Sequence, residues 1–433
     1  MAGEFKCYDV ADLLRDGTLI INDGYRAKNS ELSNVGIPFA RGGNINYGFQ
    51  FKDADHVPPE TLARVGLKRS RAGDVVFTSK GTVGRFAFVR EDTPEFVYSP
   101  QLCYWRSCNA SRIDPRWLFY WMNSREFFLQ FKGVSGQTDM AEYVSLGDQR
   151  AMKITLPPLP TQRAIAHVLG TLDDLIELNR ETNDILEEMA RALFKSWFVD
   201  FDPVRAKLEG RPPAGMDAAT ADLFPDHFQD SELGQIPKGW EVGKVSDLAT
   251  LGRVAVNPGR HPEEFFDHYS LPAFDDGRNP KTEIGSAIMS NKFLVEPDSV
   301  LLSKLNPHIP RVWLPDLNTE RRSVCSTEFM VARANAGASR DYLFSLFTNP
   351  YFASIYGTLV SGTTGSHQRI SPDSFVAMQV VSPPAPLIKA FTKVVKAMFD
   401  TIHSNLHESR DLATLRDTLL PKLLSGEVSM KGQ

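Results

Sequence analysis

The chain has 433 residues and a formal net charge of −5 at pH 7, with 42% hydrophobic and 23% charged residues. This composition excludes wholesale disorder and collagen-like chains, and the length suggests two to three domains of about 150 residues each. Four scattered cysteines exclude a disulfide framework or a zinc finger, the N-terminus lacks the apolar core of a signal peptide, and no run of about 18 apolar residues predicts a membrane span. We expect a reduced, soluble, cytoplasmic protein without membrane contact.

Strands and turns dominate the first block, residues 1–155. Apolar runs at 74–78 and 86–89 flank the turn sequence Ser79-Lys80-Gly81-Thr82-Val83-Gly84, which predicts a strand, a glycine turn and a strand. A central helix is expected at 156–200, because prolines 157, 158 and 160 mark its start, Thr161 is a good N-cap, and apolar residues recur at heptad spacing from Ile165 to Leu193. Residues 201–236, rich in aspartate, proline and glycine, are expected to be a linker with turns.

The second block, residues 237–382, and a second helix, residues 383–433, repeat this order. Val134-Ser135-Gly136 recurs as Val360-Ser361-Gly362 and Pro157-Pro158 as Pro383-Pro384, both at an offset of 226. Ser79-Lys80 recurs as Ser303-Lys304 at 224, and Leu118-Phe119 as Leu343-Phe344 at 225. A nearly constant offset over more than 100 residues indicates a duplicated unit of one block followed by one helix.

Asn179 and Asn405 lie near the middle of the two helices at the same offset of 226. Antiparallel pairing of the helices about a pseudo-two-fold axis would bring the two amides together, and a buried asparagine is a known register device in coiled coils. We therefore predict an Asn179–Asn405 pair across the seam. The alternative is two amphipathic helices that pack on globular cores.

The charge distribution gives no positive evidence for a nucleic-acid partner. Residues 156–236 carry 7 basic and 15 acidic side chains, so this one segment supplies the acidity and leaves the two blocks near neutral. Catalytic motifs are also missing. The 79–84 turn lacks P-loop spacing and runs into a strand, Asn306-Pro307-His308 lacks a second proline and an aromatic residue, and the histidines show no metal spacing. These observations favour a binding protein over an enzyme.

Three segments carry a family resemblance. The run from Leu156 through Pro160-Thr161-Gln162-Arg163 to Asn179 resembles the central repeat of type I restriction–modification specificity subunits, and 192–203 (ALFKSWFVDFDP) resembles the end of that region. Residues 415–428 (LRDTLLPKLLSGEV) resemble the C-terminal repeat of the family. The second copy departs at Leu387-Ile388-Lys389, where the first has Thr161-Gln162-Arg163.

This resemblance implies an α+β fold with an internal pseudo-two-fold duplication. Two mixed α/β target-recognition domains (1–155 and 237–382) would be separated by two long helices that form an antiparallel coiled coil. The family reads a bipartite, asymmetric DNA target, one half with each domain. The implied partners are double-stranded DNA, two methyltransferase (modification) subunits and restriction or translocase subunits. S-adenosylmethionine and ATP would belong to those partners, so no cofactor, no metal and no catalytic residue is expected in this chain.

Polar loops that recur in both blocks are the candidates for DNA contact. In the first block they contain Arg41, Asn44, Asn46, Lys80, Thr82, Arg85, Gln137 and Thr138. In the second they contain Lys304, Asn306, His308, Arg311, Thr363, Thr364, Ser366, His367, Gln368 and Arg369. Such side chains can contact phosphates and base edges, although each one alone is equally consistent with a solvated surface residue. The competing hypothesis for the whole chain is a coiled-coil assembly scaffold that does not itself read sequence.

Overall fold

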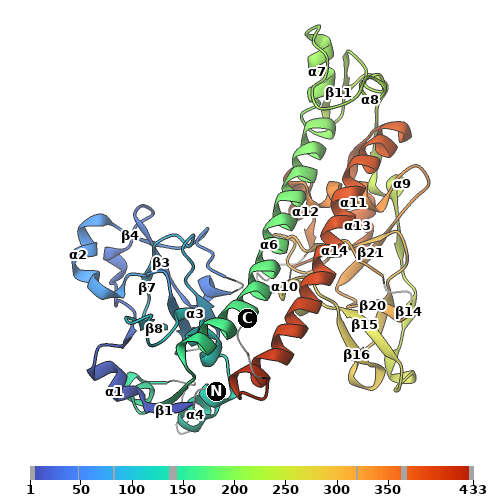
Figure 1. The fold of residues 1–433 in the computed structure, drawn as a ribbon. Helices are drawn as coiled ribbons and strands as arrows, with labels where there is room; N and C mark the ends of the chain where they lie inside the picture. The colour runs from blue at the N-terminus through green and yellow to red at the C-terminus, as the bar shows by residue number, and fades with distance from the viewer. Residues whose placement is uncertain are drawn as a thin grey trace. The chain divides into compact units, whose positions relative to one another are not determined.

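The computed structural model describes residues 5–46, 48–80, 83–135, 144–317, 320–361 and 368–428. The chain divides into two compact units: unit 1 is Met1–Leu178 with Glu408–Gln433, and unit 2 is Asn179–His407. Two long helices, α6 (Leu159–Phe198) and α14 (Ala385–Leu424), each contribute one part to each unit (Figure 1). The predicted pair of long helices is confirmed.

The first block forms unit 1 around a four-stranded sheet, β2 (Leu19–Asp23), β8 (Leu102–Ser107), β5 (Asp74–Thr78) and β6 (Phe86–Phe88), in that order. β1 (Lys6–Asp9) pairs with β9 (Lys153–Leu156), and β3 (Ile37–Ala40) lies between β4 (His56–Val57) and β7 (Val97–Tyr98). The helices are α1 (Val10–Arg15), α2 (Leu62–Val65), α3 (Pro115–Met122), α4 (Arg125–Ser135) and α5 (Leu146–Arg150). The two strands predicted at 74–78 and 86–89 are confirmed as β5 and β6.

Both faces of the central strands in unit 1 are covered. Phe77 on β5 packs with Trp105 and Trp121 in one apolar cluster, whereas the adjacent Val76 joins a second cluster with Tyr104. Successive side chains of a strand point to opposite faces, so a strand buried on both sides reads as one continuous apolar run. The uninterrupted sequence of β5 follows from this packing.

Unit 2 repeats this architecture. Its corresponding sheet is β13 (Ala249–Gly252), β21 (Phe329–Ala334), β18 (Ser299–Ser303) and β19 (Val312–Trp313), and β12 (Glu241–Lys244) pairs with β24 (Gln379–Ser382) as β1 pairs with β9. A five-stranded sheet contains β14 (Ala255–Val256), β17 (Lys292–Leu294), β20 (Arg322–Cys325), β15 (Phe265–Tyr269) and β16 (Lys281–Ile284), and β22 (Val360–Ser361) pairs with β23 (Arg369–Ile370). The helices of this block are α9 (Val245–Leu248), α10 (Leu271–Asp275), α11 (Arg340–Thr348), α12 (Pro350–Thr358) and α13 (Pro372–Val376). The duplication predicted from the repeat offsets is confirmed.

Residues 201–236, expected as a linker with turns, are a folded part of unit 2. They form α7 (Asp202–Leu208), α8 (Ala218–Ala221) and a hairpin of β10 (Phe228–Ser231) and β11 (Gly234–Pro237). Phe201, Val204, Phe224 and Ile236 are at most 7% exposed within the large core of unit 2. Prolines and glycines mark turns here, but the aromatic and aliphatic residues between them anchor the segment.

The start of α6 is tied to the first block through Gln162, which is 1% exposed. Its Oε1 accepts from the Asp114 amide (2.9 Å), and its Nε2 donates to the carbonyls of Arg112 (3.0 Å) and Pro157 (2.8 Å). The helix begins at Leu159, so Thr161 lies inside the first turn and is not the N-cap. Proline at position 160 is tolerated because the first helical amides have no intrahelical acceptor.

Within each unit α6 and α14 pack antiparallel. In unit 2 the Phe391 ring lies 5.7 Å from that of Phe194, and Asn405 Nδ2 donates to Asn183 Oδ1 at 2.9 Å. In unit 1 Arg416 Nη1 contacts Asp173 Oδ1 at 2.7 Å, and Leu423 joins the core.

The asparagine pair across the helices is therefore Asn183–Asn405, and the predicted Asn179–Asn405 pairing is wrong by one helical turn. Part of the predicted seam faces solvent, since Leu175 and Met189, which recur at the predicted heptad spacing, are 39% and 50% exposed. Residues four apart lie on the same helix face, so an apolar repeat alone did not distinguish the two registers.

Candidate DNA-recognition surface

Two predicted loops of the first block meet at Gln101 and Ser79. The Gly42 amide donates to Gln101 Oε1 (3.2 Å), and the Ser79 amide donates to the Gln101 carbonyl (2.9 Å). The Val144 amide also donates to the Ser79 carbonyl (3.3 Å). The loop at 41–46 and the start of the 79–84 turn, which sequence reasoning picked out separately, are thus brought together near the end of β5, whereas residues 136–139 of the third predicted loop lie outside the described residues.

Asn44 shapes the first of these loops. Its Oδ1 accepts from the Arg41 amide and its Nδ2 donates to the Gln50 carbonyl, both at 2.8 Å. The exposed Arg41 side chain lies 2.6 Å from Asp55, and Asn46 follows the short 3₁₀ turn Gly42–Ile45. Asn44 therefore holds the loop's backbone, which leaves Arg41 as the residue of this loop with a charged exposed group.

Two further predicted residues of the first block, Lys80 and Arg85, lie between β5 and β6. Lys80 is exposed at the end of β5, and the Arg85 amide donates to Thr78 Oγ1 (3.1 Å). Thr82, Gln137 and Thr138 lie outside the described residues.

The second block repeats the same hydrogen bonds with different residues. The Lys304 amide donates to the Glu328 carbonyl (2.8 Å), and the Ile370 amide donates to the Lys304 carbonyl (3.1 Å). Ser79 therefore corresponds to Lys304 and Gln101 to Glu328. The sequence repeat had aligned Lys80 with Lys304; the hydrogen bonds correct that alignment by one residue.

Glu328 organises the charges of the second surface. Arg369 Nε and Nη2 donate to its two carboxylate oxygens at 3.0 and 2.8 Å, and this pairing lowers the pKa of Glu328. Partial burial lowers the pKa of the nearby Lys304, an effect that Glu328 opposes and Arg369 reinforces. The surface thus carries two cations and one carboxylate where the first block has the neutral Ser79 and Gln101.

The remaining predicted residues of the second block differ in exposure. His308 is exposed, and Asn306 has a left-handed backbone (φ 50°) with its amide bonded to the Gln368 carbonyl at 2.9 Å. Arg311, only 13% exposed, makes two hydrogen bonds to Asp275 at 2.7 and 2.9 Å. Thr363, Thr364, Ser366 and His367 lie outside the described residues.

Sequence reasoning missed Gln101 and Glu328. Each is the third residue of a tight turn that starts at a serine and leads into a buried strand, with the Leu102 amide bonded to the Ser99 carbonyl and the Phe329 amide to the Ser326 carbonyl, both at 2.9 Å. The repeated pattern Ser-x-Gln/Glu before an apolar strand, at an offset of 227, was the available signal.

In the part of the chain that the structure describes, no group of three or more His, Cys, Asp or Glu side chains could hold a metal ion. Among the same residues, no helix is long and apolar enough to cross a membrane.

Comparison with known proteins gives one consistent family. Residues 4–188 match the family model described as type I restriction modification DNA specificity domain. The chain is 26% identical over 411 residues to the type I restriction enzyme HindI specificity subunit of Haemophilus influenzae, covering 83% of this chain and 88% of that protein. It is 22% identical to the MjaIX specificity subunit of Methanocaldococcus jannaschii, covering 90% and 85%.

A solved structure shares the fold. The crystal structure of a type I restriction-modification S subunit from M. genitalium superposes with a TM-score of 0.52 at 13% identity, covering 97% of this chain and 96% of that one. The domain match, the alignments over most of the chain and the shared fold agree with the duplicated architecture described above, and the chain is similar over most of its length to type I restriction–modification specificity subunits.

Proposed function

We propose that this chain is the sequence-reading subunit of a type I restriction–modification complex, and that each block reads one half of a bipartite DNA target. The observation that carries this proposal is the surface built twice around Ser79–Gln101 and Lys304–Glu328, with the same backbone hydrogen bonds and different side chains. One scaffold that presents two different sets of polar groups suits the reading of two different sequences.

The difference between the two surfaces favours an asymmetric target. A glutamine side chain is suited to the N6 and N7 edge of adenine, whereas arginine and lysine are suited to the O6 and N7 edge of guanine. Gln101 lies at the centre of the first surface, and Arg369 with Lys304 at the second. We therefore expect unlike half-sites, with guanine contacts concentrated in the half read by the second block.

The chemistry of modification would reside in partner subunits. The relatives are named as specificity subunits of restriction enzymes, which supports assembly with DNA and methyltransferase subunits. We propose that two modification subunits bind this chain and supply S-adenosylmethionine, that ATP-dependent restriction subunits join them, and that this chain performs no catalysis itself.

The test is selection from random duplex pools by the full chain assembled with its modification subunits. Arg369→Ala should weaken discrimination at the bases it contacts by about 1–3 kcal/mol each and leave the other half-site intact. Gln101→Ala should alter only the first half-site. Arg333→Ala is the matched control, because Arg333 is 50% exposed and ion-paired with Glu296, whereas Arg369 is 49% exposed and ion-paired with Glu328.

The scaffold hypothesis predicts a different result. A scaffold would enrich no sequence motif, and none of the three variants would change the selected DNA. Enrichment of one continuous motif, or loss of both half-sites in a single variant, would contradict the two-reader proposal.

A further inference from the structure

The outer edge of β24 in unit 2 presents backbone groups that the fold itself does not use. The Val245 amide donates to the Met378 carbonyl at 2.9 Å, so every second residue of the strand from Met378 onward bonds to β12. The residues between them, Gln379 and Val381, therefore direct their amides and carbonyls away from β12. In the part of the chain that the structure describes, these four groups have no hydrogen-bond partner.

The matching edge of unit 1 is closed by side chains. Lys153 and Thr155 occupy the same outward positions of β9. The Gln130 carboxamide on α4 accepts from the Lys153 amide at 2.7 Å and donates to its carbonyl at 2.8 Å. The Glu126 carboxylate accepts from the Thr155 amide at 3.0 Å. A planar amide that both donates and accepts is what the peptide group of a neighbouring strand offers, so unit 1 shows which chemistry satisfies this edge.

In unit 2 the helix that faces the edge lacks both polar side chains. α4 and α12 align at an offset of 225, because the side chains at positions 124 and 349, just before the two helices, each accept from an amide of the first turn. At that offset Glu126 corresponds to Tyr351 and Gln130 to Ile355. Ile355 has no polar group to offer, and Tyr351 is 57% exposed. The edge of β24 is thus left for a group from outside the chain.

The same edge lies on a cavity of about 380 Å³ in unit 2. Its lining is largely aromatic and aliphatic and comes from α6, α11, α12 and β11, with Phe198, Leu346, Phe352 and Ile236 among the residues. A volume of this size is within the range of ligand sites, and an apolar lining favours a large apolar side chain.

A cation lines this cavity as well. Arg205 of α7 is exposed, its Nε donates to the Asp200 carbonyl at 2.8 Å, and its guanidinium carbon lies 5.3 Å from the centre of the Phe228 ring. The Asp200 carboxylate pairs instead with Lys195, and Arg205 has no ion pair among the residues that the structure describes. A guanidinium beside an apolar cavity and a strand edge is suited to a carboxylate on the ligand.

We propose that this cavity and the edge of β24 bind an extended, acidic segment of a partner protein, one segment per chain. The segment adds as a strand to β24, as the Gln130 carboxamide does in miniature at β9. One large apolar side chain of the segment fills the cavity, and a neighbouring acidic side chain pairs with Arg205. Unit 1 cannot bind the same segment, because its edge is already bonded. The inference does not depend on DNA reading.

The first experiment tests the edge by amide hydrogen exchange in the full chain. The amides of Gln379 and Val381 should exchange at least about tenfold faster than the two outward amides of β9, because only the latter are hydrogen-bonded. Ile355→Gln with Tyr351→Glu copies the unit 1 pair onto α12 and should slow exchange at 379 and 381 about tenfold. Equal exchange at the two edges of the wild-type chain would overturn the inference.

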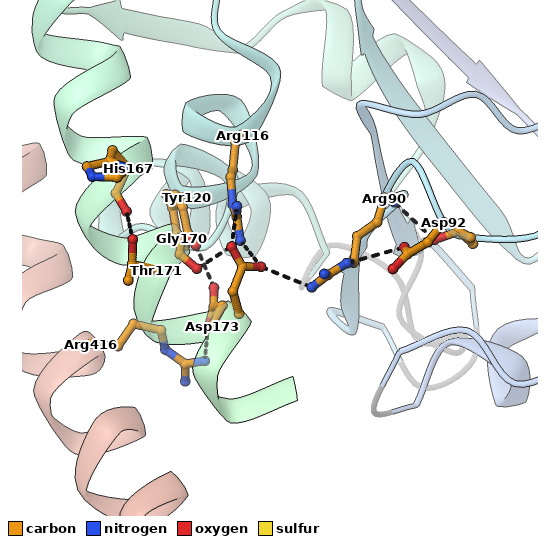
Figure 2. Close-up of polar contacts among 11 residues, drawn as sticks. Arg90, Asp92, Arg116, Tyr120, His167, Gly170, Thr171, Asp173 and Arg416 are labelled. Carbon is orange, nitrogen blue, oxygen red and sulfur yellow. Dashed lines mark hydrogen bonds and ion pairs between the residues drawn. The ribbon is translucent and has the colours of Figure 1, made fainter. Parts of the chain in front are cut away.

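The converse change in unit 1 has a matched control. Gln130→Ile should speed exchange of the Lys153 amide about tenfold. Tyr120→Phe should leave it unchanged, because the Tyr120 hydroxyl donates to Asp173 of α6 at 2.6 Å and this contact does not involve β9. Figure 2 shows this contact, with Arg416 of α14 at the same carboxylate. Equal acceleration in the two variants would contradict closure of the edge by Gln130.

The second experiment tests the ligand with a defined probe. A pool of acetylated and amidated octapeptides, each with one central phenylalanine and seven randomised positions, is passed over the immobilised full chain. Retained peptides should carry an aspartate or glutamate at a fixed distance from the phenylalanine and should bind once per chain in calorimetry. Ile355→Gln with Tyr351→Glu should weaken binding at least tenfold. Arg205→Gln should remove the preference for the acid, whereas Arg211→Gln should not, because Arg211 pairs with Glu209 and does not line the cavity.

Backbone methylation of a selected peptide separates strand addition from simple filling of the cavity. Methylating the amides at one set of alternate residues removes the donors that face β24 and should abolish binding, whereas methylating the other set should have little effect. Retention of no peptide, two sites per chain, equal binding of both methylated forms or an unchanged acid preference in Arg205→Gln would overturn the inference. Self-association of the free chain that the Ile355→Gln and Tyr351→Glu pair abolishes would identify a second copy as the occupant and would overturn it too.

Discussion

A buried ion pair in the first block gives a sharp test of whether the two readers are independent. Asp74 is fully buried, and Arg106 Nε and Nη2 donate to its two oxygens, both at 2.6 Å. The Tyr98 hydroxyl donates to the same carboxylate at 2.6 Å, and burial next to this charge raises the Tyr98 pKa well above its usual value. Asp74→Ala removes the one carboxylate that holds this network.

The expected cost follows from what is left behind. A buried guanidinium without its partner destabilises a protein by about 3–5 kcal/mol. For a unit of about 200 residues, each kcal/mol lowers Tm by roughly 2–4 °C, so the transition of unit 1 should fall by about 6–20 °C. Replacing both partners, Asp74→Leu with Arg106→Met, should recover most of the loss, because no charge then stays buried.

Differential scanning calorimetry of the full chain measures this change, and Ser299 supplies the control. Ser299 occupies the Asp74 position in β18, and Arg333 at the Arg106 position pairs instead with Glu296. Ser299→Ala should therefore change Tm by less than about 2 °C. In DNA selection, Asp74→Ala should lose the first half-site and keep the second. A Tm within about 2 °C of wild type, or equal loss of both half-sites, would refute the reasoning.

Three further predictions concern unit 2. Asn183→Leu leaves the Asn405 amide short of a partner and should lower the free energy of unfolding, measured in urea, by about 1–3 kcal/mol. Changing both residues to Leu should recover stability, and a single variant as stable as wild type would exclude the register role. Burial raises the pKa of Asp341, so Asp341→Asn should raise the free energy of unfolding at pH 7 by about 1 kcal/mol, and a loss of stability would contradict this. Burial lowers the pKa of His403, so the unfolded chain binds this proton more tightly than the folded chain does. The free energy of unfolding should therefore fall as pH drops below about 6.5, and His403→Gln should make this pH dependence flatter than in wild type.

The architecture was predictable because its signals are long. Prolines at the helix starts and a nearly constant repeat offset over more than 100 residues predicted the duplication. An alignment error of one or two residues at one position does not change a signal of that length. The register of the helices was less predictable, since Asn179 and Asn183 lie on one face and either could have met Asn405 by periodicity. Only the packing of whole side chains, such as Phe194 against Phe391, settles which turn meets which.

The candidate surface was predictable in place but not in detail. Sequence reasoning located its loops but not the role of each side chain in them. Arg311 is held by Asp275, and Asn44 bonds to backbone groups of its own loop, so both stabilise loop structure. Their residue types alone do not predict this role. Gln101 and Glu328 were missed because their role depends on backbone contacts with segments more than 20 residues away.

The division of each long helix between the two units has a consequence for synthesis of the chain. Leu423 of α14 is 2% exposed in the core of unit 1, alongside Ile165 and Leu169 of α6. Residues 179–407, all of unit 2, are translated between these two parts of one core. The apolar side chains of α6 in this core therefore lack their α14 partners until the last turns of α14 have been synthesised. Unit 1 can be completed only after all of unit 2 has been translated, and these apolar side chains stay accessible to chaperones or to a neighbouring nascent chain throughout that interval.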